Sequence, residues 1–309
     1  MNLNRAAVAI AEEMVGKREE LKVEAFELKN GTTVIDCGLK APGGLGAGRL
    51  FALACMGGLA EIGLGLEDYG GIELLTVRVA TDHPIIACLA SQKAGWSIKG
   101  EKFFALGSGP ARILARKPKK TFERVRYTEV AGKAVIALET AKYPTEAVAE
   151  EIARECGIKT EDLYILVART ASVAGAIQVS ARVVETALYR MDHLEFELAG
   201  VRGAVGTAPV APLVGDDGRM MGITNDMIIY GGSVYISSSA PMDPAQIPSS
   251  NSKAYGKPFA ELFEEAGHDF YKIPPETFAP ASVTIESPSG LLRAGALNPG
   301  VIKRSIGLG

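Results

Sequence analysis

Three polar side chains of one predicted helix are the strongest candidates for chemistry in this 309-residue chain. Gln178, Arg182 and Glu185 follow one another at spacings of four and three residues, which places them on one face of a helix over 172–191. Apolar residues occupy more than one other side, so we expect this helix to be buried. Because buried ion pairs seldom stabilise a core, one interpretation is an Arg–Glu site for acid–base chemistry. The alternative is an ordinary ion pair on a solvated face.

Two glycine-containing turns are candidate anion sites, one before Gly95 and one before a short helix predicted after Pro110. Backbone N–H groups at a helix start attract anions, so both turns could hold a phosphate group. Ordinary turn chemistry is the alternative. The candidate residues are Ser91, Gln92 and Lys93 in the first turn, and Gly107, Ser108 and Arg112 in and after the second. Asn225 and Asp226, ahead of an apolar run predicted to be a strand, could face a ligand or form a turn or cap.

The elements that must position these residues follow from hydrophobic periodicity and from turn residues. Asn30-Gly31 is a strong hairpin signal between two short strands. Besides the helix over 172–191, the expected helices lie at 4–20, 48–62, 144–156 and 257–267. The expected strands lie at 23–28, 32–37, 72–80, 84–90, 101–106, 133–139 and 163–168, and further short apolar runs at 226–237, 270–273 and 282–286.

The order of these elements predicts the fold class. Segment 133–191 alternates strand, helix, strand and helix, which is typical of an α/β unit, whereas the first 110 residues have α+β character. A stretch rich in Pro and basic residues at 116–126 is the best candidate for a junction. We therefore expect an N-terminal α+β domain over 1–120 and a C-terminal α/β domain over 121–309 that carries the candidate helix.

Composition excludes several classes of protein. Four cysteines lie far apart without a CxxC pair and the three histidines are isolated, so we expect buried thiols, no disulfides and no metal site. A net charge of −3 gives no positive field for nucleic acid, although the segment 116–126 is a local basic exception. No apolar run is long enough to span a membrane, and the N-terminus lacks the pattern of a secretory signal. The expected location is the cytoplasm.

Four sequence blocks resemble one known family in the same order along the chain. They are SQKAGW (91–96), ALGSGPAR (105–112), TASVAGAIQVSARVVETALYRM (170–191) and TNDMIIYGGSVY (224–235). The third block looks like the signature helix of methenyltetrahydromethanopterin cyclohydrolase, an archaeal-type enzyme of one-carbon metabolism and methanogenesis. The resemblance implies that Arg182 and Glu185 are the active-site pair.

The implied reaction adds water to the cationic methenyl bridge of 5,10-methenyltetrahydromethanopterin and gives the 5-formyl product reversibly. Glu185 would take a proton from water and return it to the leaving nitrogen. Burial would raise the pKa of this carboxyl group and Arg182 would lower it, which keeps it suited to proton transfer. Gln178 would orient the water or the ring, the two glycine turns would hold the phosphate-bearing tail, and Asn225 and Asp226 would face the pterin edge.

The resemblance also implies two α/β domains with a pocket between them, a homotrimer, and no permanently bound cofactor, since the pterin is the substrate. Tetrahydromethanopterin is a better expectation than tetrahydrofolate on family similarity alone. Two alternatives stay open. One is a non-catalytic pterin-binding protein, and the other is a different metal-free hydrolase that uses the same carboxylate.

Overall fold

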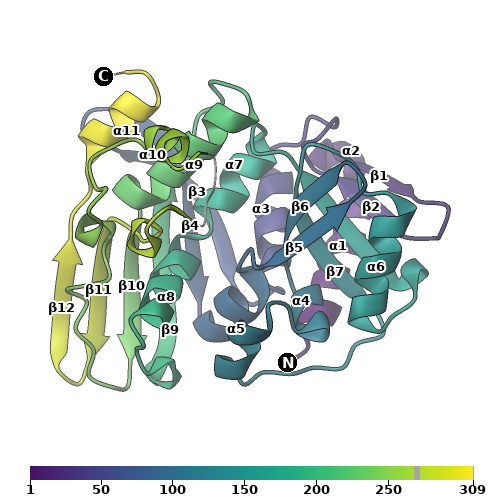
Figure 1. The fold of residues 1–309 in the computed structure, drawn as a ribbon, viewed down its shortest axis with the longest axis horizontal. Coiled ribbons are helices and arrows are strands. Elements are labelled where there is room, and N and C mark those ends of the chain that lie inside the picture. Colours follow the sequence, from purple (N-terminus) through teal and green to yellow (C-terminus); the bar gives the residue numbers. More distant parts are fainter. Residues whose placement is uncertain (268–271, 309) are drawn as a thin grey trace. The chain divides into compact units, whose positions relative to one another are not determined.

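The chain crosses between two compact α/β units three times in the computed structural model, which describes residues 1–267 and 272–308 (Figure 1). Unit 1 comprises Met1–Ala60 and Ile86–Gln178, and unit 2 comprises Glu61–Ile85 and Val179–Gly309. The expected α/β class and two-domain organisation are confirmed. The crossing points differ from the expected boundary at residue 120, which falls inside unit 1.

Strand pairing explains why residue 120 is not a crossing point. Strand β7 (Ala134–Glu139) pairs with β6 (Phe103–Ser108) on one side and with β8 (Leu163–Ala168) on the other, so one sheet joins segments before and after residue 120. The basic stretch contains the short helix α5 (Lys119–Arg124) and lies within unit 1.

The sheet of unit 1 has the order β1-β2-β8-β7-β6-β5, and its neighbours β2, β8 and β7 run parallel. Its other strands are β1 (Glu24–Glu27), β2 (Thr33–Asp36) and β5 (Trp96–Gly100). The predicted hairpin is confirmed, since β1 and β2 pair antiparallel and Gly31 takes a positive φ of 84° in the turn. The helices are α1 (Leu3–Gly16), α2 (Arg18–Leu21), α3 (Leu45–Cys55), α4 (Ala111–Ala115), α6 (Glu146–Cys156) and α7 (Val173–Ser180), whose last two residues are assigned to unit 2.

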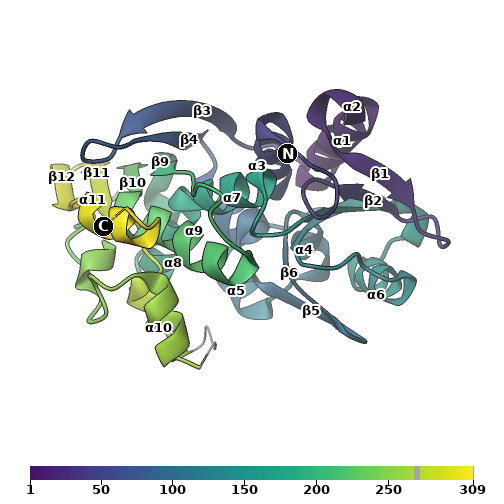
Figure 2. The same ribbon diagram turned by 90° about the horizontal axis from the view of Figure 1, so that it is seen from above.

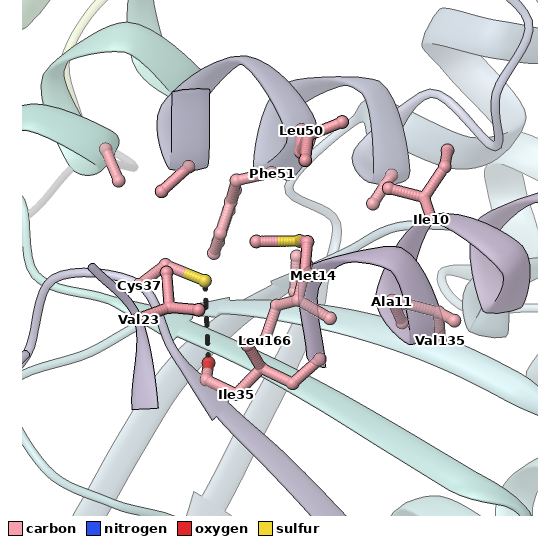
Figure 3. Packing of buried hydrophobic residues seen from close by; sticks show 14 of the residues in the cluster. Ile10, Ala11, Met14, Val23, Ile35, Cys37, Leu50, Phe51, Val135 and Leu166 are labelled. Carbon is pink, nitrogen blue, oxygen red and sulfur yellow. Dashed lines mark hydrogen bonds between the residues drawn. The ribbon is translucent and has the colours of Figure 1, made fainter. Parts of the chain in front are cut away.

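Helices cover both faces of this sheet, and α1 and α6 lie on opposite sides of it (Figure 2). Alternate strand residues serve the two cores. Figure 3 shows Met14 of α1 and Phe51 of α3 packed over Leu166 of β8, whereas Ile165 and Ile136 belong to the other cluster with residues of α6. All four cysteines are buried and unbridged, as expected.

The sheet of unit 2 has the order β12-β11-β10-β9-β4-β3, and only β10 and β11 run parallel among the pairs described. Its strands are β3 (Glu61–Asp68), β4 (Glu73–Thr81), β9 (Val201–Pro209), β10 (Ser233–Ser238), β11 (Ser282–Ser287) and β12 (Gly290–Gly295). Its helices are α8 (Val183–His193), α9 (Asp217–Gly231), α10 (Phe259–Glu265) and α11 (Pro299–Ser305). Helices α10 and α11 both contact α9, and α8 contacts β9 and β10.

Short helical turns complete the described chain. The 3-10 turns are Thr160–Asp162, Leu198–Gly200, Ser249–Asn251 and Pro275–Thr277. Segment Ile85–Gln92 is a π-helix, η1, although a strand was expected over 84–90. The N–H of Lys93, directly after this helix, donates to the carbonyl of Cys88 at 2.8 Å. Its sequence IIACLASQ is apolar without alternation, so a buried helix and a buried strand cannot be distinguished by periodicity.

The apolar run 226–237 was also assigned wrongly in its first half. Residues up to Gly231 form the last turns of α9, and only Ser233–Ser238 form a strand. Helix α9 begins at Asp217, directly after its N-cap residue Asp216, whose side chain accepts the N–H of Arg219. The segment is buried on all sides, which hides its helical period. Part of the run 270–273 lies outside the described residues.

Candidate active site

The helix predicted over 172–191 is two helices, because the helical conformation is interrupted at Ala181 and Arg182. Gln178 therefore lies on α7, whereas Arg182 is the N-cap residue of α8 and Glu185 lies in its first turn. The prediction that all three share one helix face is wrong. At the break, Ser180 at the end of α7 donates its hydroxyl to the carbonyl of Pro209, 2.8 Å away.

The first turn of α8 is held against β9 by close packing. A Cβ atom on Gly206 would lie 2.7 Å from Cγ1 of Val183 and 2.8 Å from Cγ2 of Val184, both fully buried. Only glycine permits this approach, so β9 fixes the start of α8 and with it the backbone of Arg182 and Glu185.

Glu185 is a sheltered carboxyl group, with only 7% of its surface exposed. Its place in the first turn of α8 favours a negative charge, because the helix dipole is positive there. Arg182, three residues earlier, is partly exposed. Burial, with the charges of Glu185 and Asp192, raises the pKa of Tyr189 to about 12, so this phenol stays protonated at neutral pH. The first turn of α8 thus carries a buried acid three residues after an arginine.

Gln178 is buried, and its Nε2 donates to Oε2 of Glu139 at 2.9 Å. The other oxygen of Glu139, Oε1, accepts the hydroxyl of Thr170 at 2.5 Å. Glu139 ends β7, and Thr170 lies two residues after β8. Neither was predicted as a site residue. The available signal was an acid at the end of an apolar strand in an α/β unit, where ligands commonly bind.

Ser91 and Gln92 are buried at the end of η1, and Lys93 after them is partly exposed. The hydroxyl of Ser91 donates to the carbonyl of Cys55 at 2.7 Å, and the carbonyl of Ser91 accepts the N–H of Gly109 at 2.9 Å. These contacts connect the two predicted turns to each other within unit 1. They give Ser91 a role in the fold.

Arg112 is fully buried and directs its guanidinium at backbone carbonyls. Nη1 donates to three successive carbonyls near the end of η1, those of Leu89, Ala90 and Ser91 at 3.3, 3.0 and 2.9 Å, and Nε donates to the carbonyl of Lys117 at 3.0 Å. A cation at this end of a helix satisfies carbonyls that lack intrahelical partners. The geometry therefore favours a structural role for Arg112 over the expected anion-binding one.

Gly107 and Ser108 are the last residues of β6 and do not form the expected turn. A Cβ atom on Gly107 would lie 3.0 Å from the Cδ1 atoms of Ile98 and Ile136, so the glycine makes room for the apolar core of the sheet. Ser108 is buried as well. The helix that follows, α4, has only five residues.

Asn225 and Asp226 lie inside α9, so the predicted placement directly ahead of a strand is wrong. Nδ2 of Asn225 donates to the carbonyl of Met221 at 2.8 Å, one turn earlier. Asp226 is fully buried and accepts the N–H of Phe259 at 2.9 Å and the hydroxyl of Ser305 at 2.6 Å. Burial raises the pKa of Asp226 to about 7. Both residues are occupied within the helical layer of unit 2.

The described residues contain neither a cluster of metal ligands nor a membrane-spanning helix. Within 1–267 and 272–308, no three His, Cys, Asp or Glu side chains gather as a metal site would require. Over the same ranges, every helix is too short or too polar to cross a bilayer.

Comparison with known proteins gives a match over almost the entire chain. The sequence model of the family described as "Cyclohydrolase (MCH)" matches residues 2–306. The methenyltetrahydromethanopterin cyclohydrolase of Methanocaldococcus jannaschii is 48% identical over 99% of this chain and 98% of its own length. Proteins of the same name from Methanococcus maripaludis and Methanospirillum hungatei are 45% and 43% identical over 99% of this chain, and over 98% and 99% of their own lengths. The chain belongs to the methenyltetrahydromethanopterin cyclohydrolase family.

Proposed function

We propose that this protein hydrolyses the methenyl bridge of 5,10-methenyltetrahydromethanopterin to give 5-formyltetrahydromethanopterin, in a reversible reaction of one-carbon metabolism and methanogenesis. The family match from residue 2 to 306 and the names of the relatives support this activity. The observation that carries the proposal in the molecule itself is the buried carboxyl group of Glu185, at the start of a helix that β9 holds in place.

The substrate is already activated for attack by water. Its bridging carbon is an amidinium carbon, electrophilic because a positive charge is shared between two nitrogens. Glu185 takes a proton as water adds to this carbon, and then returns that proton to the nitrogen whose C–N bond breaks. The remaining hydroxyl loses its proton as the formyl group forms. One carboxyl group therefore serves as base and then as acid, and the chemistry requires no metal.

Arg182 has two tasks in this proposal. Its positive charge lowers the pKa of a carboxyl group about one turn away, which opposes the effect of burial. Its planar set of N–H donors can also fix the orientation of that carboxylate. Both effects keep Glu185 ready to exchange protons near neutral pH.

Among the predicted binding residues, Lys93 remains our candidate for the phosphate-bearing tail, since it is partly exposed after η1. Gln178 remains a candidate for orienting the substrate through its contact with Glu139. If Lys93 binds the tail, removing its charge in Lys93→Ala raises KM about tenfold or less, as expected for one exposed ionic contact, with kcat unchanged. An unchanged KM would leave Lys93 without that role.

The direct test follows the near-ultraviolet absorption of the methenyl substrate, which disappears when the bridge opens. Purified protein should remove this absorption catalytically, and should do so equally after treatment with a chelator. Binding without loss of absorption would instead support a pterin-binding protein, and neither effect would support a hydrolase with another substrate. The same assay with methenyltetrahydrofolate tests the pterin preference, and we expect the methanopterin compound to react faster.

The homotrimer and the cytoplasmic location are further parts of the proposal. Edge strand β12 of unit 2 carries Leu291 and Leu292, which are 67% and 38% exposed. An apolar edge strand is prone to pair with another chain, so contact between copies would cover it. Light scattering of the purified protein should give three times the chain mass of 32.5 kDa.

A further inference from the structure

The carboxyl ends of three parallel strands meet at one edge of the sheet in unit 1. Strand β2 ends at Asp36 and β7 ends at Glu139, with β8 between them leading to Thr170. In open α/β sheets, ligands bind outside this edge. The two carboxyl groups there are therefore the first side chains to compare.

All hydrogen-bond acceptor positions of the Asp36 carboxylate are used by nearby donors, most of them in the loop that follows β2. Its oxygens accept four backbone N–H groups and the hydroxyl of Tyr143 at 2.5 Å. The backbone donors are Gly38, Leu39, Lys40 and Ala41, at 2.9, 2.6, 2.8 and 3.0 Å. A carboxylate offers about four lone-pair positions, so five donors leave Asp36 no capacity for a ligand.

Glu139 has a different set of contacts. It is half-buried and accepts one neutral donor on each oxygen, the hydroxyl of Thr170 and the amide of Gln178. Within residues 1–267 and 272–308, it has no cationic partner. One lone-pair position on each oxygen therefore remains, and the two donors fix the plane of the carboxylate from both sides. The carboxylate thus has capacity for two further N–H donors.

We infer that Glu139 binds the aminopyrimidinone edge of the pterin, accepting its ring N3–H and its 2-amino group. These donors lie side by side, as do those of the guanidinium in a bidentate arginine–carboxylate pair. The nitrogens of the methenyl bridge carry no hydrogen, so a two-oxygen acceptor has nothing to bind there. Thr170 and Gln178 act as positioning residues for Glu139. This inference rests on the proposed function.

Chain connectivity relates this edge to the proposed catalytic pair. Gln178, whose amide holds Glu139, precedes Arg182 by only four residues in the chain. The earlier candidates for the pterin edge, Asn225 and Asp226, are occupied elsewhere, since Asp226 accepts donors from Phe259 and Ser305. Glu139 therefore takes over the role that the sequence alone had assigned to them.

The test compares two heterocycles that differ at the recognised edge. 6-Methylpterin carries the 2-amino group, and 6-methyllumazine has an oxygen in its place. Binding of each is measured by fluorescence titration, and KM and kcat for the methenyl substrate by the absorption assay. The wild-type protein should prefer the pterin. In Glu139→Gln, an amide N–H faces the ligand donors, so pterin affinity should fall about 10- to 100-fold and the preference should disappear.

Two further variants make the result specific. Thr170→Val removes one donor that positions Glu139, and should weaken pterin binding by about three- to tenfold. Glu27→Gln, on an exposed carboxyl group of β1, removes the same charge from unit 1 and should bind both heterocycles as the wild type does. Circular dichroism melts establish that each variant is folded, and Thr170→Val provides the test if Glu139→Gln is not.

The outcomes separate this inference from the proposed function. If the wild type hydrolyses the methenyl substrate while Glu139→Gln and Thr170→Val keep full pterin affinity, the inference is overturned and the function stands. A fall in kcat with unchanged affinity for both heterocycles would also overturn it. If the wild type fails to hydrolyse the substrate but prefers the pterin through Glu139, the proposed function fails and the pterin site stands.

Discussion

Two buried carboxyl groups of unit 2 were both predicted as site residues, yet their surroundings differ. Asp226 joins three helices, because its oxygens accept donors from Phe259 at the start of α10 and from Ser305 in α11 (Figure 1). Glu185 lies in the first turn of α8, three residues after the N-cap residue Arg182. Burial raises the pKa of Asp226 to about 7, although its contacts are structural. A displaced pKa therefore marks desolvation here and is not by itself a sign of catalysis.

The largest effect on activity is expected from Glu185→Gln. The amide has the same shape but cannot exchange the proton, so turnover should fall by about two orders of magnitude or more. The melting temperature should stay within a few degrees of the wild type. Initial rates from the absorption assay measure this, with Glu264→Gln on the exposed side of α10 as a control for charge removal. Near-normal turnover would end the assignment of Glu185.

The opposite pattern is expected for Asp226→Asn. The folded pKa of about 7 exceeds the ordinary value of 3.8, so the native state holds a proton that the unfolded chain has lost. The contribution of Asp226 to stability is complete below pH 3.8 and is lost as the pH rises through 7, by up to about 1.4 kcal/mol per pH unit. The variant amide keeps an acceptor for Phe259 and a donor for Ser305. It should therefore be more stable than the wild type at pH 8.

Urea unfolding at pH 5, 6, 7 and 8 measures this difference. The stability gap between variant and wild type should widen by a few kcal/mol over that range. Asp243→Asn, on an exposed carboxyl group, should show no such trend. Turnover at pH 8 should stay within about twofold of the wild type. Loss of turnover would mean that Asp226 belongs to the active site after all, as its sequence position first suggested.

Local patterns predicted much of the fold, because their signals lie within a few residues. The hairpin at Asn30-Gly31, strands β7 and β8, and helix α6 all appear where turn residues and apolar periodicity indicate them. Strand β9 was missed because its sequence VRGAVGTAP is rich in small residues. Gly206 has no side chain because α8 packs closely on it, which is a tertiary requirement that no local pattern expresses.

The candidate site divides in the same way. Arg182 and Glu185 are three residues apart at the start of one helix, so sequence spacing alone could suggest them as a candidate pair. Glu139 is 39 residues from Gln178, and their hydrogen bond exists only because β7 and α7 belong to one unit. The guanidinium of Arg112 likewise binds carbonyls 21 to 23 residues away. The sequence suggested Arg112 as a charged site residue, but only the fold shows that its hydrogen-bond partners are backbone carbonyls.

An intermediate effect is expected for Arg182→Ala. Removing a positive charge near Glu185 raises the pKa of that carboxyl group, so the acidic limb of the pH–rate profile should move to higher pH. The maximum rate should fall about tenfold, since the carboxylate also loses a donor that orients it. Profiles of kcat from pH 5 to 9 measure both effects, with Arg202→Ala on the exposed side of β9 as control. A lower but unshifted profile would make Arg182 a purely structural residue.

The smallest effect is expected from Gly206→Ala, which disturbs Glu185 without touching it. The added methyl group would lie 2.7 Å from Val183, so the start of α8 must move by a few tenths of an ångström. Overpacking of this kind costs about 1 kcal/mol or more of stability. Because the displaced turn carries Glu185, kcat should fall several-fold while KM changes little.

A second glycine in the same sheet is a control that distinguishes the effect of the close contact from that of a glycine-to-alanine substitution in itself. Gly65 on β3 has no atom within 4 Å of an added Cβ, so Gly65→Ala should leave both stability and kcat unchanged. If Gly206→Ala lowers stability but leaves kcat intact, the first turn of α8 tolerates displacement. The buried acid would then owe its activity to its immediate neighbours, and the close contact with β9 would serve only the fold, as the contacts of Asp226 do.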